Sequence, residues 1–396
     1  MKIVTIQDSF EEVLEDIRDA RLEEDKFWVA QRDSDPNAAQ DLSYFTVNKE
    51  GINASDENLA FEVKNNKKYE VKINDELYRL QAPIRTKSFT SDPISCAEMA
   101  SDDSIAVLGT KYGDLLIIDV ANFSIKKRIQ DAHYSDVTSV RMFPSNKVIL
   151  STGTDLRIKI WDLEGNLARE MSHHKSEITS INLLGKTGRN FLSGSKDGTV
   201  NLWECGSGQV LYTFKRISDE RDPVNCVATD TDPSRGHRLS DLEIETDHTC
   251  MYVGHESGII QKFDVGSHCL TGVKFILSDK AAVTSLIPSR GLLIAGYDNG
   301  KIVFWNSADQ KPVFETRLND SYAIDHMKVL HHDENGATLL VANGPETLLR
   351  LTVKDCQLER VTYLVGLEEA FAVAGIAYKQ FVLIATQYQI ALYSST

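Results

Sequence analysis

Two sets of residues in the middle of the chain combine a histidine, a serine and an aspartate, the residue types of a nucleophilic triad. In such a triad the histidine takes the proton of the serine hydroxyl, and the carboxylate holds the imidazole in the required tautomer. Each set also contains a tryptophan, and the second set repeats the first 41 or 42 residues further on. The two sets are His133, Ser151, Asp155 and Trp161, and His174, Ser193, Asp197 and Trp203.

The repetition favours a structural role over hydrolysis, because it is in register with a periodic fold. Each histidine lies four residues before an apolar residue, Val137 or Ile178, that is expected to begin a strand. Buried polar atoms need partners, and the four side chains of each set can satisfy one another. We therefore expect two buried hydrogen-bonded tetrads and no catalytic residues. The aspartate position holds Tyr112, Ser257 or Asn299 in other repeats, so we expect those repeats to depend more on apolar packing.

The tetrads belong to a longer repeat, in which an apolar segment, a turn and a second strand end in an aromatic or aliphatic residue. Seven such end positions are separated by 43, 42, 60, 42, 46 and 42 residues. A period of this length is typical of WD repeats, each of which supplies four short strands to a propeller blade. The end positions are Ile118, Trp161, Trp203, Phe263, Trp305, Leu351 and Tyr393. The long interval contains a polar insertion, 230–248, which we expect to form a surface loop or hairpin.

The segment FLSGSKDGTVNLW, residues 191–203, illustrates one unit. FLSGS is expected to be an inner strand buried on both faces, KDG a tight turn, and TVNLW the next strand. The spacing predicts an all-β fold, a seven-bladed propeller over residues 84–396. The last repeat ends at Tyr393 on a third strand, so residues 84–89 are expected to supply the fourth strand and close the ring.

Residues 1–83 do not follow the repeat, and they predict a small α+β or β-rich N-terminal domain. A helix is expected over residues 9–25, with Ser9 and Glu12 as a capping box. Its apolar face is formed by Phe10, Val13, Leu14 and Ile17. The acidic face of this helix is expected to be solvated. Strand-like runs follow at residues 26–30, 43–47, 59–63, 68–73 and 77–81.

Composition excludes several classes of protein. The 396 residues carry 43 basic and 58 acidic side chains, a net charge of −15, which argues against nucleic acid as a partner. No apolar run is long enough to span a membrane, and the first residues do not resemble a signal peptide. The 6 cysteines lack metal-ligand spacing, and we expect reduced thiols, no cofactor and no metal. Reduced thiols are typical of a cytosolic or nuclear protein, and we expect the chain to be monomeric when free.

Four phrases point to a narrower resemblance. They are VTIQDSFEEVLED at the start, DAHYSDVTSVRMFP, FLSGSKDGTVNLWECGSGQVLYTF and YVGHESGII. Together they resemble one branch of the WD-repeat family, the proteasomal ATPase-associated factors, which are chaperones of proteasome regulatory-particle assembly. The match runs from the first residues to about residue 310 and then fades. The resemblance implies a non-catalytic chaperone that binds the C-terminal domain of a proteasomal ATPase subunit.

Another class of function stays open, a WD-repeat substrate receptor or scaffold in a ubiquitin ligase or signalling complex. Such receptors often carry Trp-Asp-x-Arg at a strand end, whereas this chain has Glu164 and Gly206 at the arginine position. A reader of basic histone tails would also use an acidic propeller surface.

The loops that precede the innermost strands of a WD-repeat propeller lie on one face of the ring. In this chain six of the seven loops carry at least one acidic residue and few basic ones. We expect this face to bind a basic partner with a strong dependence on salt. The acidic residues are Asp92, Asp136, Glu177, Asp222, Asp320, Glu368 and Glu369.

Overall fold

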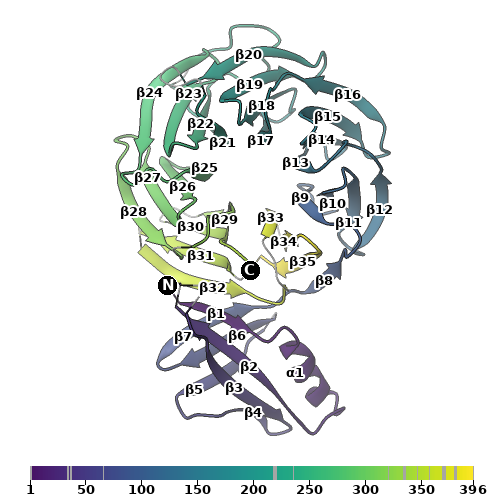
Figure 1. Cartoon of the computed structure of the whole chain (residues 1–396), viewed down its shortest axis with the longest axis vertical. Helices are drawn as coiled ribbons and strands as arrows, with labels where there is room; N and C mark the ends of the chain where they lie inside the picture. Colours follow the sequence, from purple (N-terminus) through teal and green to yellow (C-terminus); the bar gives the residue numbers. More distant parts are fainter. Residues whose placement is uncertain are drawn as a thin grey trace.

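A ring of antiparallel sheets and a smaller domain at its side make up the molecule (Figure 1). The computed structural model describes residues 2–33, 35, 38–65, 67–216, 221–234, 236–319, 321–332, 336–345, 347–355, 357–367, 372–378 and 381–395. Within these residues no helix is both long and apolar enough to cross a membrane.

Seven groups of four strands follow one another around the ring (Figure 1). The first three groups are β9 (Ile94–Met99), β10 (Ile105–Thr110), β11 (Leu115–Asp119) and β12 (Ser124–Ile129); β13 (Val137–Met142), β14 (Val148–Gly153), β15 (Arg157–Asp162) and β16 (Leu167–Ser172); and β17 (Ile178–Leu183), β18 (Asn190–Ser195), β19 (Thr199–Glu204) and β20 (Gln209–Lys215). The next two groups are β21 (Val224–Thr231), β22 (Thr249–His255), β23 (Ile259–Asp264) and β24 (Cys269–Ile276); and β25 (Val283–Ser289), β26 (Leu292–Tyr297), β27 (Lys301–Asn306) and β28 (Pro312–Arg317).

The last two groups complete the ring next to the smaller domain. They are β29 (His326–His332), β30 (Gly336–Ala342), β31 (Leu348–Lys354) and β32 (Gln357–Leu364); and β33 (Ala372–Tyr378), β34 (Phe381–Thr386), β35 (Gln389–Ser394) and β8 (Arg85–Ser88). In the final group β8 pairs with β35 in antiparallel fashion, with Lys87 opposite Ile390. A strand from before the first repeat thus completes the sheet that holds the end of the chain.

The repeat spacing located the strands correctly. All seven repeat-end residues lie on third strands, namely β11, β15, β19, β23, β27, β31 and β35. The expectation that FLSGS is an inner strand buried on both faces is confirmed. This segment lies in β18, the second strand of its group, while β17 faces the channel (Figure 1). Every residue of β18 is buried, because sheets on both sides cover a second strand.

The insertion between β21 and β22 is a loop with turns and contains no strand in its described residues, 232–234 and 236–248. It packs against the neighbouring sheet through side chain–backbone bonds. Glu245 accepts hydrogen bonds from the backbone N–H groups of Lys186 and Thr187, both at 2.9 Å. Ile244 N donates to Asn190 Oδ1 at 2.7 Å. Of the two forms expected, the loop is the one present.

The smaller domain combines one helix with two groups of strands. Its elements are β1 (Ile3–Ile6), α1 (Phe10–Arg18), β2 (Glu24–Arg32), β3 (Asp41–Asn48), β4 (Gly51–Ala54), β5 (Leu59–Val63), β6 (Lys68–Ile73) and β7 (Glu76–Gln81). The helix is shorter than predicted, since the chain turns at Ala20 (φ 57°) before β2 begins. The predicted capping box is wrong, because the Ser9 side chain makes no cap bond and instead accepts from Gln7 Nε2 at 2.9 Å. The acidic face is partly docked, since Glu11 accepts from Tyr69 Oη at 2.5 Å.

The two parts of the molecule share a sheet and a core. Strand β7 pairs in parallel with β32, which gives a seven-stranded sheet in the order β29-β30-β31-β32-β7-β6-β5. One apolar cluster joins Phe10 and Phe27 of the smaller domain to Leu339, Leu351 and Tyr363 of the ring. The sequence repeat begins near residue 83, but the structure has no boundary there. Strands from before and after this residue belong to one sheet.

Candidate interaction face

One end of the ring carries both the loops that lead into the channel-lining strands and the turns between second and third strands. In several sheets a backbone hydrogen bond of the same kind joins the loop to the turn. Thr154 N donates to Asp136 O at 2.9 Å, Lys196 N to Glu177 O at 2.9 Å, and Glu256 N to Pro223 O at 3.0 Å. Because both tetrads lie here, we call this end of the ring the tetrad face.

The first tetrad is a closed chain of hydrogen bonds. His133 Nδ1 lies 3.0 Å from Asp155 Oδ1, and His133 Nε2 lies 2.8 Å from Ser151 Oγ. The indole N–H of Trp161 donates to the same serine oxygen at 3.0 Å. Burial lowers the pKa of His133, although the charge of Asp155 acts to raise it. The neutral ring then donates from Nδ1 to the carboxylate and accepts the serine proton at Nε2.

The second tetrad repeats this arrangement in the next sheet. His174 Nδ1 lies 3.0 Å from Asp197 Oδ2, and His174 Nε2 lies 2.6 Å from Ser193 Oγ. Trp203 Nε1 donates to Ser193 Oγ at 2.8 Å. Both serines are fully buried, with 0% exposure, so a substrate has no route to either hydroxyl. The arrangement can hold a loop, a turn and two strands together, and it offers no accessible nucleophile.

The corner of the β21–β24 sheet contains a polar cluster that the repeat pattern did not reveal. Here the aspartate comes from the loop and the histidine from the end of a second strand. Asp222 accepts hydrogen bonds from Ser257 N at 3.1 Å and Ser257 Oγ at 2.6 Å, and it forms an ion pair with Arg216. His255 Nδ1 lies 3.3 Å from the Asp222 carbonyl oxygen. The expectation that this sheet relies more on apolar packing was wrong at this corner, because a reversed His–Asp pair fills it.

A second acidic residue of the predicted face also forms an ion pair inside the protein. Asp92 is buried and lies 2.7 Å from Arg128 Nη2, while Arg128 Nε donates to Asp114 at 2.7 Å. Asp92 and Asp222 are therefore internal counterions rather than free surface charges. This use could not be read from their spacing, since the arginine partners lie on neighbouring outer strands or loops.

The other predicted partner-binding residues have different positions. Asp136 and Glu177 are half-buried on the tetrad face, and Glu177 pairs with Lys196 at 2.7 Å. Asp320, Glu368 and Glu369 lie outside the described residues. The assignment of this set to partner binding stays a prediction.

Three further acids on the tetrad face were missed. They are Glu256, Asp279 and Asp298, all exposed. Burial raises the pKa of Asp298, and the charges of Glu256 and Asp279 raise it further, so the three acids lie near one another. Asp279 also forms an ion pair with Lys301, whose Nζ lies 2.7 Å away. Asp279 precedes Val283 by four residues, the offset of His133 before Val137, so the repeat spacing could have found it.

Three tyrosines also project from the tetrad face, and composition alone gave no signal for them. Tyr112 lies in the β10–β11 turn, Tyr134 in the loop before β13, and Tyr388 in the β34–β35 turn. Tyr134 is 78% exposed, with the guanidinium of Arg157 5.5 Å from its ring centre. Exposed tyrosines at the rim of an acidic surface are typical of protein-binding sites.

The five described cysteines are unpaired. Burial raises the pKa of Cys96, Cys205 and Cys226 to about 12, so these thiols stay protonated and unreactive. Over the described part of the chain, no group of three or more His, Cys, Asp or Glu side chains could hold a metal ion.

Comparison with known proteins identifies the repeats. The WD domain, G-beta repeat family matches residues 125–162 and 165–204, which span β12–β15 and β16–β19. The 26S proteasome regulatory subunit RPN14 of Saccharomyces cerevisiae is 29% identical over 266 residues, 64% of this chain and 62% of that protein. The COMPASS component SWD3 of the same yeast is 25% identical over 224 residues, 54% of this chain and 64% of that protein. The chain thus matches less than two thirds of either relative's length.

A solved structure shows the same architecture. The WD40 repeats of RRP9 superpose with a TM-score of 0.64 at 14% identity, covering 80% of this chain and 99% of that one. At this identity the likeness concerns the fold alone. The chain is an all-β protein with WD repeats arranged as a propeller, and it resembles the yeast proteasome subunit in sequence.

Proposed function

We propose that this WD-repeat propeller is a non-catalytic assembly chaperone of the proteasome regulatory particle. The observation that carries the proposal is the similarity to a yeast proteasome regulatory subunit over 266 residues. We propose further that it binds the C-terminal domain of a proteasomal ATPase subunit, in the cytoplasm and the nucleus. The closed, buried tetrads support a binding role without catalysis.

The tetrad face supports the choice of binding surface. It carries Asp136, Glu177 and the Glu256–Asp279–Asp298 group in a chain whose net charge is −15. Acidic residues of this kind steer a basic partner toward the surface and make association dependent on salt. The exposed tyrosines add apolar area that can be buried in a complex, which charge alone does not provide.

The class of partner is tested by purification of the tagged chain from cells. Recovery of proteasome ATPase subunits, confirmed by mass spectrometry, is the expected result. Recovery of ubiquitin-ligase or chromatin subunits without proteasome subunits would support the substrate-receptor or histone-reader alternatives and contradict the proposal.

The binding surface is tested by calorimetry against the isolated C-terminal domains of the proteasomal ATPases at two salt concentrations. The variant Asp136→Lys/Glu177→Lys/Asp298→Lys should bind more weakly and with less dependence on salt, and Tyr134→Ala should bind more weakly at both. Asp222 is left intact, since its loss would disturb the fold. Asp241→Lys is the matched control, because this exposed acid lies in the insertion at the opposite end of the ring. Equal binding by all these variants would place the contact elsewhere.

A further inference from the structure

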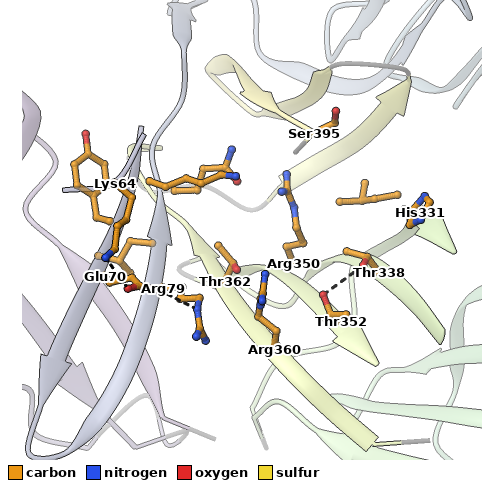
Figure 2. A pocket seen from close by; sticks show the side chains of 15 residues that line it. Lys64, Glu70, Arg79, His331, Thr338, Arg350, Thr352, Arg360, Thr362 and Ser395 are labelled. Carbon is orange, nitrogen blue, oxygen red and sulfur yellow. Dashed lines mark hydrogen bonds and ion pairs between the residues drawn. The ribbon is translucent and has the colours of Figure 1, made fainter. Parts of the chain in front are cut away.

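A cavity of about 650 Å³ lies where the smaller domain meets the ring (Figure 2). Its floor is one face of the seven-stranded sheet, with side chains from β31 and β32 of the ring and from β6 and β7 of the smaller domain. Arg350, Thr362, Arg79 and Glu70 follow one another across four neighbouring strands in register. Ser395, just beyond β35, lines the opposite side. The site therefore exists only because the two parts of the molecule share a sheet.

The cavity is strongly basic in a protein that is acidic overall. Five cationic side chains line it against a single carboxylate, that of Glu70. The cationic residues are Lys64, Lys68, Arg79, Arg350 and Arg360. Formally this gives a lining charge of +5 − 1 = +4, whereas the chain as a whole carries −15.

The one carboxylate is already engaged by two of the cations. Glu70 forms ion pairs with Lys64 and Arg79 (Figure 2). Its carboxylate lies 3.3 Å from Lys64 Nζ and 3.3 Å from Arg79 Nε. The other three, Lys68, Arg350 and Arg360, have no carboxylate partner among the described residues. Three positive charges are thus held close together without a counterion from the described chain.

The burial of these charges carries an energetic penalty. Arg350 Nη2 donates to the Ser394 carbonyl oxygen at 2.8 Å, but its Nε is buried and has no hydrogen-bond partner in the described structure. Burial lowers the pKa of Arg350. The pKa of Lys68 is lowered by burial and then by the charges of Arg350 and Arg360. A bound anion would remove each of these penalties, because it supplies both charge and hydrogen-bond acceptors.

We propose that this cavity binds a small molecule that carries several phosphate groups. A phosphate group brings close to two negative charges and three acceptor oxygens, so it can meet two guanidinium groups and an ammonium at once. A carboxylate brings only one charge. The volume admits a compact ligand, and the −15 charge of the chain disfavours a long polyanion such as a nucleic acid. This site is separate from the tetrad face and does not depend on the proposed proteasome role.

The proposal is tested by calorimetry and thermal unfolding of the full chain. Inositol hexakisphosphate is the main probe, with inorganic phosphate and the tricarboxylate tricarballylate for comparison. Binding of inositol hexakisphosphate should raise the melting temperature by mass action, and tricarballylate should bind more weakly. Vesicles with and without phosphatidylinositol 4,5-bisphosphate distinguish a soluble ligand from a lipid headgroup. Binding to the vesicles alone would move the site to membranes and contradict a soluble ligand.

Variants link binding to the cavity. Arg350→Gln and Arg360→Gln should each weaken inositol hexakisphosphate binding by about tenfold or more, as loss of a charge-assisted hydrogen bond predicts. Lys127→Gln is the matched control, because it removes an exposed cation from β12, outside the cavity. Arg360 is exposed, so its replacement should not lower the unliganded melting temperature, even if Arg350→Gln destabilises the fold. No binding at millimolar probe, or equal binding by Arg360→Gln and Lys127→Gln, would overturn the proposal.

Discussion

The corner of the β17–β20 sheet and the corner of the β21–β24 sheet hold the same two residue types in opposite places. In the first, the loop supplies His174 and the turn supplies Asp197. In the second, the loop supplies Asp222, and His255 comes from the end of β22. Each arrangement binds the loop to the turn and leaves its carboxylate accepting backbone N–H groups. The corner therefore requires a polar connection between loop and turn, while the order of the residues is free.

The two corners differ in what balances the carboxylate. Asp197 accepts hydrogen bonds from His174, Thr199 and the Lys175 backbone N–H, and no described lysine or arginine side chain pairs with it. Asp222 has a nearly buried guanidinium, that of Arg216, as its partner. Removal of an acid from a buried ion pair leaves an unbalanced charge, which is more costly than an unsatisfied hydrogen bond. The comparison thus predicts that replacement of Asp222 lowers the stability of the fold more than replacement of Asp197.

The largest effect is expected for Asp222→Ala. We expect the free energy of unfolding to fall by about 3–5 kcal/mol, because the substitution breaks a nearly buried ion pair with Arg216 and removes the acceptor of two Ser257 hydrogen bonds. Chemical denaturation followed by circular dichroism measures the change. Asp136→Ala is the control, since Asp136 occupies the corresponding loop but is half-buried, and we expect a change within about 0.5 kcal/mol. Equal losses in the two variants would remove the distinction between structural and surface acids on this face.

A smaller loss is expected for Asp197→Ala. The His174 ring, two backbone N–H groups and one hydroxyl would lose their acceptor, at a cost of about 1–3 kcal/mol. Thermal unfolding of this variant should show a lower melting temperature. A full melting temperature with loss of a chemical activity would instead favour catalysis by the tetrad.

A substitution in a third kind of corner is expected to cause a still smaller loss of stability. In the β25–β28 sheet Trp305 Nε1 donates to Tyr297 Oη at 3.1 Å, so a tyrosine takes the place of the tetrad serine. Tyr297→Phe keeps the ring and removes one acceptor, and we expect a loss of about 1 kcal/mol. Ser193→Ala should cost more, because Ser193 serves both His174 and Trp203. Denaturant titration of the two variants in parallel checks this order, and a larger loss for Tyr297→Phe would contradict it.

Sequence reasoning located the strands because the repeat is written in short-range patterns. Turn residues and alternation fixed the third strands from Ile118 to Tyr393, and the tetrad residues recur at a fixed offset. The reversed pair of Asp222 and His255 escaped, because a pattern search assumes a constant residue order. A search for one acid and one histidine in either order, one in the loop and the other near the turn, would have found the pair of Asp222 and His255.

Features that depend on distant contacts could not be read from the chain. Strand β7 joins β32 across about 280 residues of sequence, and no local signal marks a parallel pair of this kind. The basic cavity follows from that pairing, since Lys68 and Arg350 are remote in sequence. The burial of Asp92 likewise depends on Arg128 from an outer strand.

The smallest effect is expected in the pH dependence of stability, and it compares the two histidine positions directly. Burial lowers the pKa of both His133 in its tetrad and His255 in the reversed corner, below the ordinary value of 6.5. The unfolded chain then binds protons before the folded chain does, so stability is complete above pH 6.5 and is lost as the pH falls below it. Aspartates such as Asp197 do not contribute between pH 7.5 and 5.5, because even unfolded aspartate titrates near pH 3.9.

Denaturation midpoints measured from pH 7.5 to 5.5 test this expectation. His255→Asn should show a shallower loss of stability toward low pH than the unmodified chain, whatever its stability at pH 7.5. His133→Gln should also make stability depend less on pH. Because this substitution breaks the tetrad, the variant should be less stable than the unmodified chain at every pH. His237→Gln is the control, because this side chain is exposed, and its curve should be parallel to that of the unmodified chain. If both buried-histidine variants keep the full slope, neutral histidines do not hold these corners together, and the comparison between tetrad and reversed pair loses its electrostatic basis.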